Sequence, residues 1–118
     1  MSPSALEYLR HISDELDYLS RQTKLFKRED FFKDETLQKA FVRSLEVIGE
    51  ATKKIPNEFK EKYNQVQWKS VAGMRDKLIH DYFGIDYEIV WDVVINKAPQ
   101  LNQEFKRILK KEDSESRV

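Results

Sequence analysis

The chain has 118 residues, of which 40% are hydrophobic and 36% charged, with only three Gly and three Pro. This length and composition favour a single helical, globular domain and exclude two domains or a disordered chain. Lys plus Arg and Asp plus Glu both number 21, so the overall charge provides no strong attraction to nucleic acid, and any RNA contact must come from local patches.

The residue types also restrict the chemistry. There is no Cys, which excludes disulfides, thiolate catalysis and the usual structural zinc sites. Two His residues make no convincing metal site unless a dimer doubles them, so we expect no metal and no cofactor. No segment has the character of a membrane span or a signal peptide, so we expect a cytoplasmic protein without membrane contact.

The first predicted helix begins near Pro3, with Ser2 as its N-cap. His11 on this helix matches no motif and is expected to be solvated. Residues 24–33 break the helical period and predict a connection with one short helical turn over packed aromatics. Apolar residues at spacings of three and four predict one buried stripe along the first helix: Leu6, Leu9, Ile12, Leu16 and Leu19.

The second predicted helix runs over about residues 34–55, antiparallel to the first, with acidic residues at its start. Gly49 lies in its middle, where Gly costs about 1 kcal/mol relative to Ala. We therefore expect another backbone, or Trp68, to approach closely there. Pro56 ends this helix, and a short helix follows over residues 58–63.

The third predicted helix runs from about Trp68 to Phe83, and Gly84 follows it as a left-handed terminal residue. This helix carries the chemically most distinctive stretch of the chain. Its predicted buried residues are Trp68, Val71, Ala72, Leu78 and Ile79.

The fourth predicted helix begins after the cap Asp86, and Pro99 predicts a kink or break near Lys97. Residues 111–118 are too polar to fold alone, so we expect one domain over residues 1–110 and a frayed, disordered tail. The sequence therefore predicts an all-α, up-down bundle of four main helices plus a short helix. The apolar positions of the fourth helix are Val90, Trp91, Val94, Ala98, Leu101, Phe105 and Ile108.

Arg75, His80 and Tyr82 crowd into eight positions of the third predicted helix. The planar Arg fork matches phosphate oxygens, and a His can give or take a proton near neutral pH, so the pair suits phosphoryl transfer. On one continuous helix His80 would lie about 140° around the axis from Arg75. A second copy facing the first across a two-fold axis would bring Arg75 and His80 side chains of the two copies together. We therefore expect the site in the cleft of a homodimer.

This spacing occurs together with a Leu-Glu-Val-Ile-Gly-Glu-Ala stretch over residues 45–51 and with Trp68, Gly73, Met74, Ile85, Asp86 and Trp91. In this combination, residues 38–101 resemble the HepT group of HEPN proteins. These are small helical toxins encoded beside a minimal nucleotidyltransferase antitoxin, MntA.

The resemblance implies a metal-independent endoribonuclease toxin. Arg75 and His80 match the two defining residues of the HEPN ribonuclease site, and Asp76 matches the polar position after the Arg. The ribose 2′-hydroxyl would attack the adjacent phosphate, leaving a cyclic phosphate and a free 5′-hydroxyl. His80 would transfer protons, and Arg75 would stabilise the phosphate charge. Asp76 could orient His80 from one turn away, although its charge would oppose an incoming phosphate.

Tyr82 matches the tyrosine to which the MntA partner attaches AMP. A bulky anion at Tyr82 would fill the cleft and compete for Arg75, which makes the modification a sensible off switch. Lys69 and Lys77, with residues 53–54, can supply a positive rim for RNA.

Each of these residues also has a purely structural explanation. His80 can be a hydrogen-bonded interior imidazole, Tyr82 can pack at a helix end, and the lysines can form a solvated face. The main functional alternative is a non-catalytic HEPN binding module that docks its nucleotidyltransferase partner and is modified by it, and a plain helical dimerisation domain is a third. Arg75 can instead pair with a nearby carboxylate: Asp76, Glu46 or Glu50.

Overall fold

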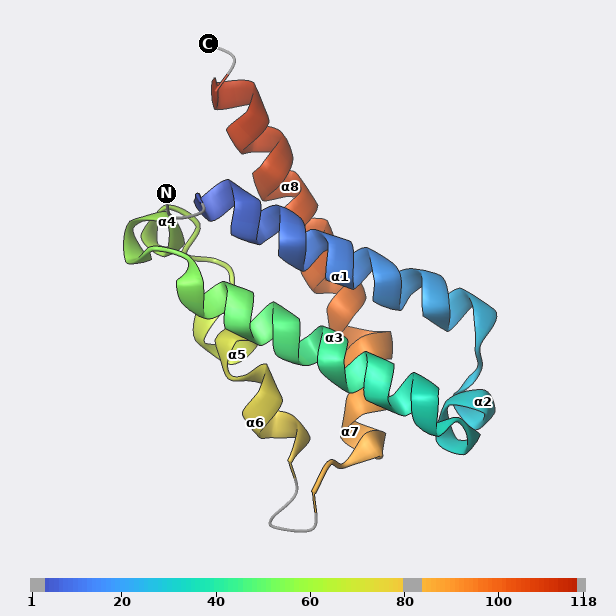
Figure 1. Cartoon of the computed structure of the whole chain (residues 1–118). Coiled ribbons are helices and arrows are strands. Elements are labelled where there is room, and N and C mark those ends of the chain that lie inside the picture. Colours follow the sequence, from blue (N-terminus) through green and yellow to red (C-terminus); the bar gives the residue numbers. More distant parts are fainter. Residues whose placement is uncertain (1–3, 80–83, 117–118) are drawn as a thin grey trace.

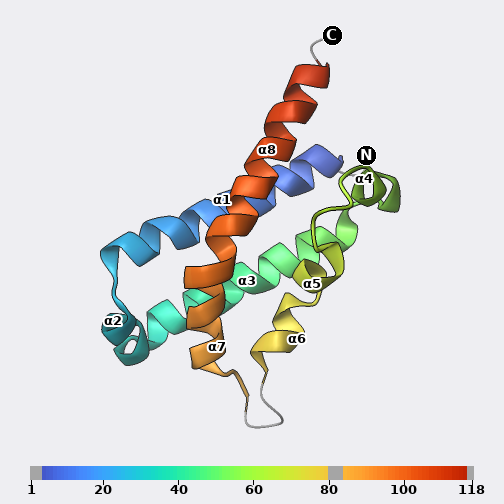
Figure 2. The same cartoon turned by 180° about the vertical axis from the view of Figure 1, so that it is seen from behind.

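The computed structural model describes residues 4–79 and 84–116, where the chain forms helices and one isolated β-bridge, so the all-α class is confirmed for this part of the chain. α1 and α3 run antiparallel, and α7, η2 and α8 follow one another in a long rod that crosses them (Figure 1 and Figure 2). No described helix is both long and apolar enough to cross a bilayer. The elements are α1 (Ala5–Leu25), α2 (Arg28–Lys33), α3 (Glu35–Lys54), α4 (Asn57–Lys62), α5 (Trp68–Ala72), α6 (Met74–Leu78), α7 (Tyr87–Asp92), the π-helical η2 (Val93–Lys97) and α8 (Ala98–Ser116).

Three helices begin at side-chain caps. Ser4, Asp34 and Asp86 each accept backbone N–H groups of the first turn of α1, α3 and α7. The predicted cap Asp86 is confirmed, and the acidic residue expected at the start of the second helix, Asp34, serves as the cap of α3. The cap of α1 is Ser4 rather than Ser2, which lies outside the described residues, because the Ser4 hydroxyl accepts the Glu7 N–H at 3.2 Å and its backbone is extended.

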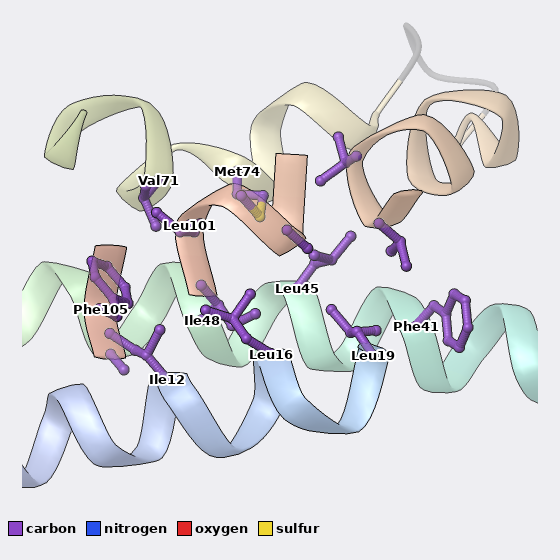
Figure 3. Packing of buried hydrophobic residues seen from close by; sticks show 14 of the residues in the cluster. Ile12, Leu16, Leu19, Phe41, Leu45, Ile48, Val71, Met74, Leu101 and Phe105 are labelled. Carbon is purple, nitrogen blue, oxygen red and sulfur yellow. The ribbon is translucent and has the colours of Figure 1, made fainter. Parts of the chain in front are cut away.

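The predicted apolar stripe of α1 lies against α3 and α8 and forms the centre of the core (Figure 3). Phe31 of the predicted short turn, α2, is fully buried, with ring centroids 5.1 Å from Phe41 and 5.3 Å from Trp91. Burial of such side chains contributes about 1.5–3 kcal/mol each, so this core carries most of the stability. Its fully buried aliphatic residues include Leu9, Ile12, Leu19, Leu45, Ile48, Leu78 and Val90.

The expected close approach at Gly49 is confirmed. A Cβ added there would lie 3.3 Å from the Ala72 carbonyl oxygen and 3.5 Å from that of Val71. The approaching group is thus the backbone of α5. The missing side chain lets the end of α5 rest directly on the middle of α3.

The prediction of one continuous third helix is wrong. α5 ends before Gly73, α6 ends at Leu78, and Ile79 is extended, with φ −93° and ψ 127°. Ile79 forms an antiparallel bridge with Ile85, and the Asp86 N–H donates to the Leu78 carbonyl at 2.7 Å. These contacts between residues six and eight positions apart replace the helical hydrogen bonds, and Gly73 between the two short helices weakens a continuous helix further. Two short helices, α5 and α6, therefore stand where the third of the four predicted main helices was expected.

The end of α6 at Leu78 affects the predictions for two later residues, Ile79 and Gly84. Ile79 was predicted to be buried but is 42% exposed, because it has left the helix whose inner face would have covered it. Gly84 has the predicted positive φ, at 101°, and directly precedes the bridge residue Ile85. Positive φ is accessible to Gly at little cost, which explains its presence in this connection.

The irregularity predicted near Lys97 takes the form of the π-helical turn η2, directly before α8. Pro99 has no N–H and cannot continue the regular hydrogen-bond ladder, so the wider turn lies where that ladder is interrupted. The rod remains continuous through it (Figure 2).

α8 continues to Ser116, whereas the sequence predicted a frayed tail after residue 110. The Lys62 ammonium lies 2.8 Å from Glu112 and 2.7 Å from Glu115, and the Tyr63 hydroxyl donates to Glu112. Hydrogen bonds from Lys62 and Tyr63 lower the pKa of Glu112, while burial and the bond to Glu112 raise the pKa of Tyr63 to about 12. Contacts from a distant part of the chain thus hold the last turns helical.

The packing at Gly49 predicts a specific sensitivity to substitution. Gly49→Val should lower the free energy of unfolding by about 1–3 kcal/mol, because its side chain would overlap rigid backbone of α5. Chemical denaturation measures this, with Lys39→Val on the exposed face of α3 as the matched control. Equal unfolding free energies for the two variants would show that α5 does not rest on Gly49.

Candidate functional site

The five-residue helix α6 presents three charged side chains to solvent. Met74 and Leu78, four residues apart, are buried on its inner side. Because residues four apart share one face of a helix, the three residues between them, Arg75, Asp76 and Lys77, lie on its exposed side. The apolar anchors of α6 therefore determine which way the candidate catalytic Arg faces.

Arg75 forms an ion pair with α3. Its Nε lies 3.5 Å from Oε2 of Glu46, and the side chains are 60% and 27% exposed respectively. Of the carboxylates that the sequence offered as partners, Glu50 is instead paired with Lys53 at 3.4 Å. An exposed pair contributes about 0–1 kcal/mol, so the contact with Glu46 orients the guanidinium more than it stabilises the fold. Most of the Arg75 side chain remains accessible to a ligand.

The predicted RNA-contact residues differ in their surroundings. Lys77 donates a hydrogen bond to the Ser70 hydroxyl, which connects α6 to α5. Lys69 on α5 is exposed. The Asp76 side chain is exposed beside Arg75, while its N–H donates to the Gly73 carbonyl at 3.1 Å. The structure thus gathers one Arg, one carboxylate and two Lys on the adjoining helices α5 and α6.

His80 and Tyr82 lie outside the described residues, so their positions relative to Arg75 stay predictions. The continuous helix that was expected to connect Arg75 with His80 is interrupted. The angle of about 140° between Arg75 and His80 assumed one continuous helix, and that helix ends at Leu78. The idea that Asp76 orients His80 from one turn away loses the same helical basis.

Glu46 is the contact that the sequence did not single out. It appeared there only as one of three carboxylates within reach of Arg75. The sequence feature that could have indicated it is Gly49, because close packing of α5 there also brings α6, which follows α5 directly, against the preceding turn of α3. Glu46, one turn before Gly49, accordingly faces α6.

The helical fold and an exposed Arg five positions ahead of a His are the features of a HEPN domain. The family described as Ribonuclease HepT-like matches residues 7–108, which is most of the chain. The chain belongs to this HepT-like family, and the resemblance drawn from the sequence is confirmed.

Relatives with ribonuclease names support the same assignment. A protein of Caldanaerobacter subterraneus subsp. tengcongensis named "Putative RNase TTE0752" is 52% identical over 105 residues, covering 89% of this chain and 94% of that protein. "Probable ribonuclease HepT" of Thermococcus cleftensis is 40% identical over 110 residues, covering 93% of this chain and all 100% of that protein. No solved structure gives a significant match.

The exposure of the ion pair predicts that Arg75 is not needed for folding. Arg75→Ala should change the free energy of unfolding by less than about 1 kcal/mol. Leu78→Ala in the same short helix should lower it by about 2–5 kcal/mol, because that side chain is fully buried. Thermal or chemical denaturation of both variants compares them, and an equally large loss for Arg75→Ala would make Arg75 a structural residue.

Proposed function

We propose that this protein is a homodimeric, metal-independent endoribonuclease, the toxin of a toxin-antitoxin pair. The observation that supports this most directly is the Arg75 guanidinium, which Glu46 holds at the surface of α6 while leaving its side chain 60% exposed. It lies five residues before His80 in a chain that belongs to a ribonuclease family. The names of its relatives describe them as RNases.

In the proposed reaction Arg75 binds a non-bridging phosphate oxygen and stabilises the charge that develops there. His80 acts as general base or acid as the 2′-hydroxyl oxygen bonds to phosphorus and the bond to the 5′ oxygen breaks. The 2′ proton leaves to a base and the 5′ oxygen receives a proton, giving a 2′,3′-cyclic phosphate and a free 5′-hydroxyl. No cofactor enters this sequence, and a two-fold dimer supplies two Arg75–His80 sets to one cleft.

The neighbouring charges modulate phosphate approach. Asp76 is proposed to orient His80, and its exposed carboxylate opposes phosphate, so the positive charge of Arg75 must dominate locally. Lys69, exposed on α5, is proposed to contact the RNA backbone, as is Lys77 once it exchanges its hydrogen bond with Ser70.

Control is proposed to come from an MntA-like minimal nucleotidyltransferase that transfers AMP to Tyr82. The added phosphate is an anion that a nearby guanidinium binds strongly. An AMP group on Tyr82 would therefore occupy Arg75 and exclude RNA from the cleft.

RNA cleavage by purified protein tests the catalytic proposal. His80→Ala should reduce the rate about 10²- to 10⁴-fold, because it removes the proton-transfer group. Arg75→Ala should also reduce it strongly, whereas Arg107→Ala, an exposed Arg on α8, should not. Activity should persist in EDTA, and the products should carry a cyclic phosphate. Equal activity in all variants would remove the catalytic assignment.

AMP transfer tests the partner proposal. After incubation with ATP and the partner, intact-mass analysis should show the gain of one or more AMP units. The gain should vanish in Tyr82→Phe and persist in Tyr87→Phe, the matched control. Modification without any RNA cleavage by the unmodified protein would instead assign the chain as a non-catalytic module that docks and is modified by its partner. A chain with neither property would be a plain dimerisation domain.

A further inference from the structure

A hollow of about 270 Å³ lies between α1 and α3, which run side by side in Figure 1. Tyr8 and His11 of α1 line one wall, and residues of α3 between Arg43 and Lys54 line the other. On α3 these residues recur at spacings of four, three and four, as Arg43, Val47, Glu50 and Lys54. They form a second stripe about 180° around the axis from the buried core positions of the same helix.

The charges of this stripe favour an anion. Among the described residues, no hydrogen bond or ion pair joins Arg43 or Lys54 to another side chain. Glu50, the carboxylate between them, lies 3.4 Å from Lys53, which balances its charge. Two cations without partners therefore stand about 16 Å apart along α3, at the two ends of the hollow.

The floor between these cations is apolar. Val47 and Ala51 lie there, beside the ring of Tyr8 and the imidazole of His11. Flat rings over an apolar floor accept an unstacked base, and cations at both ends accept flanking phosphates. The hollow is too small for a larger ligand but has room for a single ring system. This combination suits a single strand, since the bases of a duplex are stacked inside it.

The hollow also adjoins the candidate catalytic edge. Glu50 lines it, and Glu46, one helical turn away on α3, holds Arg75. One turn is about 5.4 Å, so a strand in the hollow can continue over α3 to Arg75. The two edges thus lie on the same helix, one turn apart along its axis.

We propose that the α1–α3 groove, lined by Tyr8, His11, Arg43, Val47, Glu50 and Lys54, binds a single-stranded segment of the RNA substrate next to the cleaved bond. Arg43 and Lys54 contact phosphates, and one base packs on Tyr8 and His11. This inference rests on the proposed function, because it places substrate of the same reaction.

The test measures binding of a short fluorescent single-stranded RNA by anisotropy in the His80→Ala background, which prevents cleavage. Arg43→Gln/Lys54→Gln should raise the Kd about tenfold and lower the salt dependence of binding by about 1.4 in logarithmic slope, the loss of two phosphate contacts. Lys24→Gln/Lys33→Gln, which removes two exposed cations outside the groove, should leave both unchanged. A duplex of the same sequence should bind more weakly than the single strand.

A second measurement locates the RNA. Photo-crosslinking from a thio-substituted base, followed by peptide mass analysis, should mark the peptide that contains Tyr8 and His11. Unchanged RNA affinity in Arg43→Gln/Lys54→Gln overturns the inference. Loss of only partner binding or dimerisation in that double variant overturns it as well. If the wild-type protein cleaves RNA while Arg43→Gln/Lys54→Gln keeps its RNA affinity, the proposed function is retained and only the groove inference is overturned. Groove binding without RNA cleavage by the wild-type protein would overturn the ribonuclease assignment and leave only the binding of single-stranded RNA in the groove.

Discussion

The close contact between Gly49 and the backbone of α5 determines the arrangement of the candidate site. Any side chain at this position would meet the Val71 and Ala72 carbonyls, so the absence of one lets α5 rest on α3. α6 follows directly after Gly73, and the buried Met74 and Leu78 fix its rotation. Arg75 is thereby directed outward and placed against Glu46. One helix–helix contact in the core thus controls the direction of an exposed guanidinium.

α3 combines several tasks because its faces differ. Its inner stripe is fully buried at Phe41, Leu45 and Ile48, one edge holds Glu46 for Arg75, and the outer stripe carries the cations of the α1–α3 groove. This division is the proposed means by which a chain with equal numbers of acidic and basic residues binds an anion. Ion pairs neutralise some carboxylates locally, Glu50 and Glu46 among them, and the cations of the groove provide attraction over short distances only.

Local patterns predicted those parts of the fold that depend on local interactions. The apolar stripe of α1, the cap Asp86, the acidic start of α3 and the need for Gly49 all follow from spacing and residue type. The third helix was predicted wrongly because apolar spacing does not show the bridge between Ile79 and Ile85 or the hydrogen bond from Asp86 to Leu78, which end the helix. The end of α8 likewise depends on Lys62, about fifty residues earlier in the chain. For the site, the motif identified Arg75, but its choice of Glu46 over other carboxylates required the packing of α3 on α6.

The central claim is that packing on α3 presents the Arg75 guanidinium to a phosphodiester. The most direct measurement follows the Nε–H resonance of Arg75 by ¹⁵N NMR during titration with a 2′-O-methyl RNA, which binds but lacks the attacking hydroxyl. We predict a saturable shift of this resonance with the same Kd as the RNA complex, and loss of that shift in Gly49→Val. A resonance that does not move while RNA saturates the protein would contradict the account.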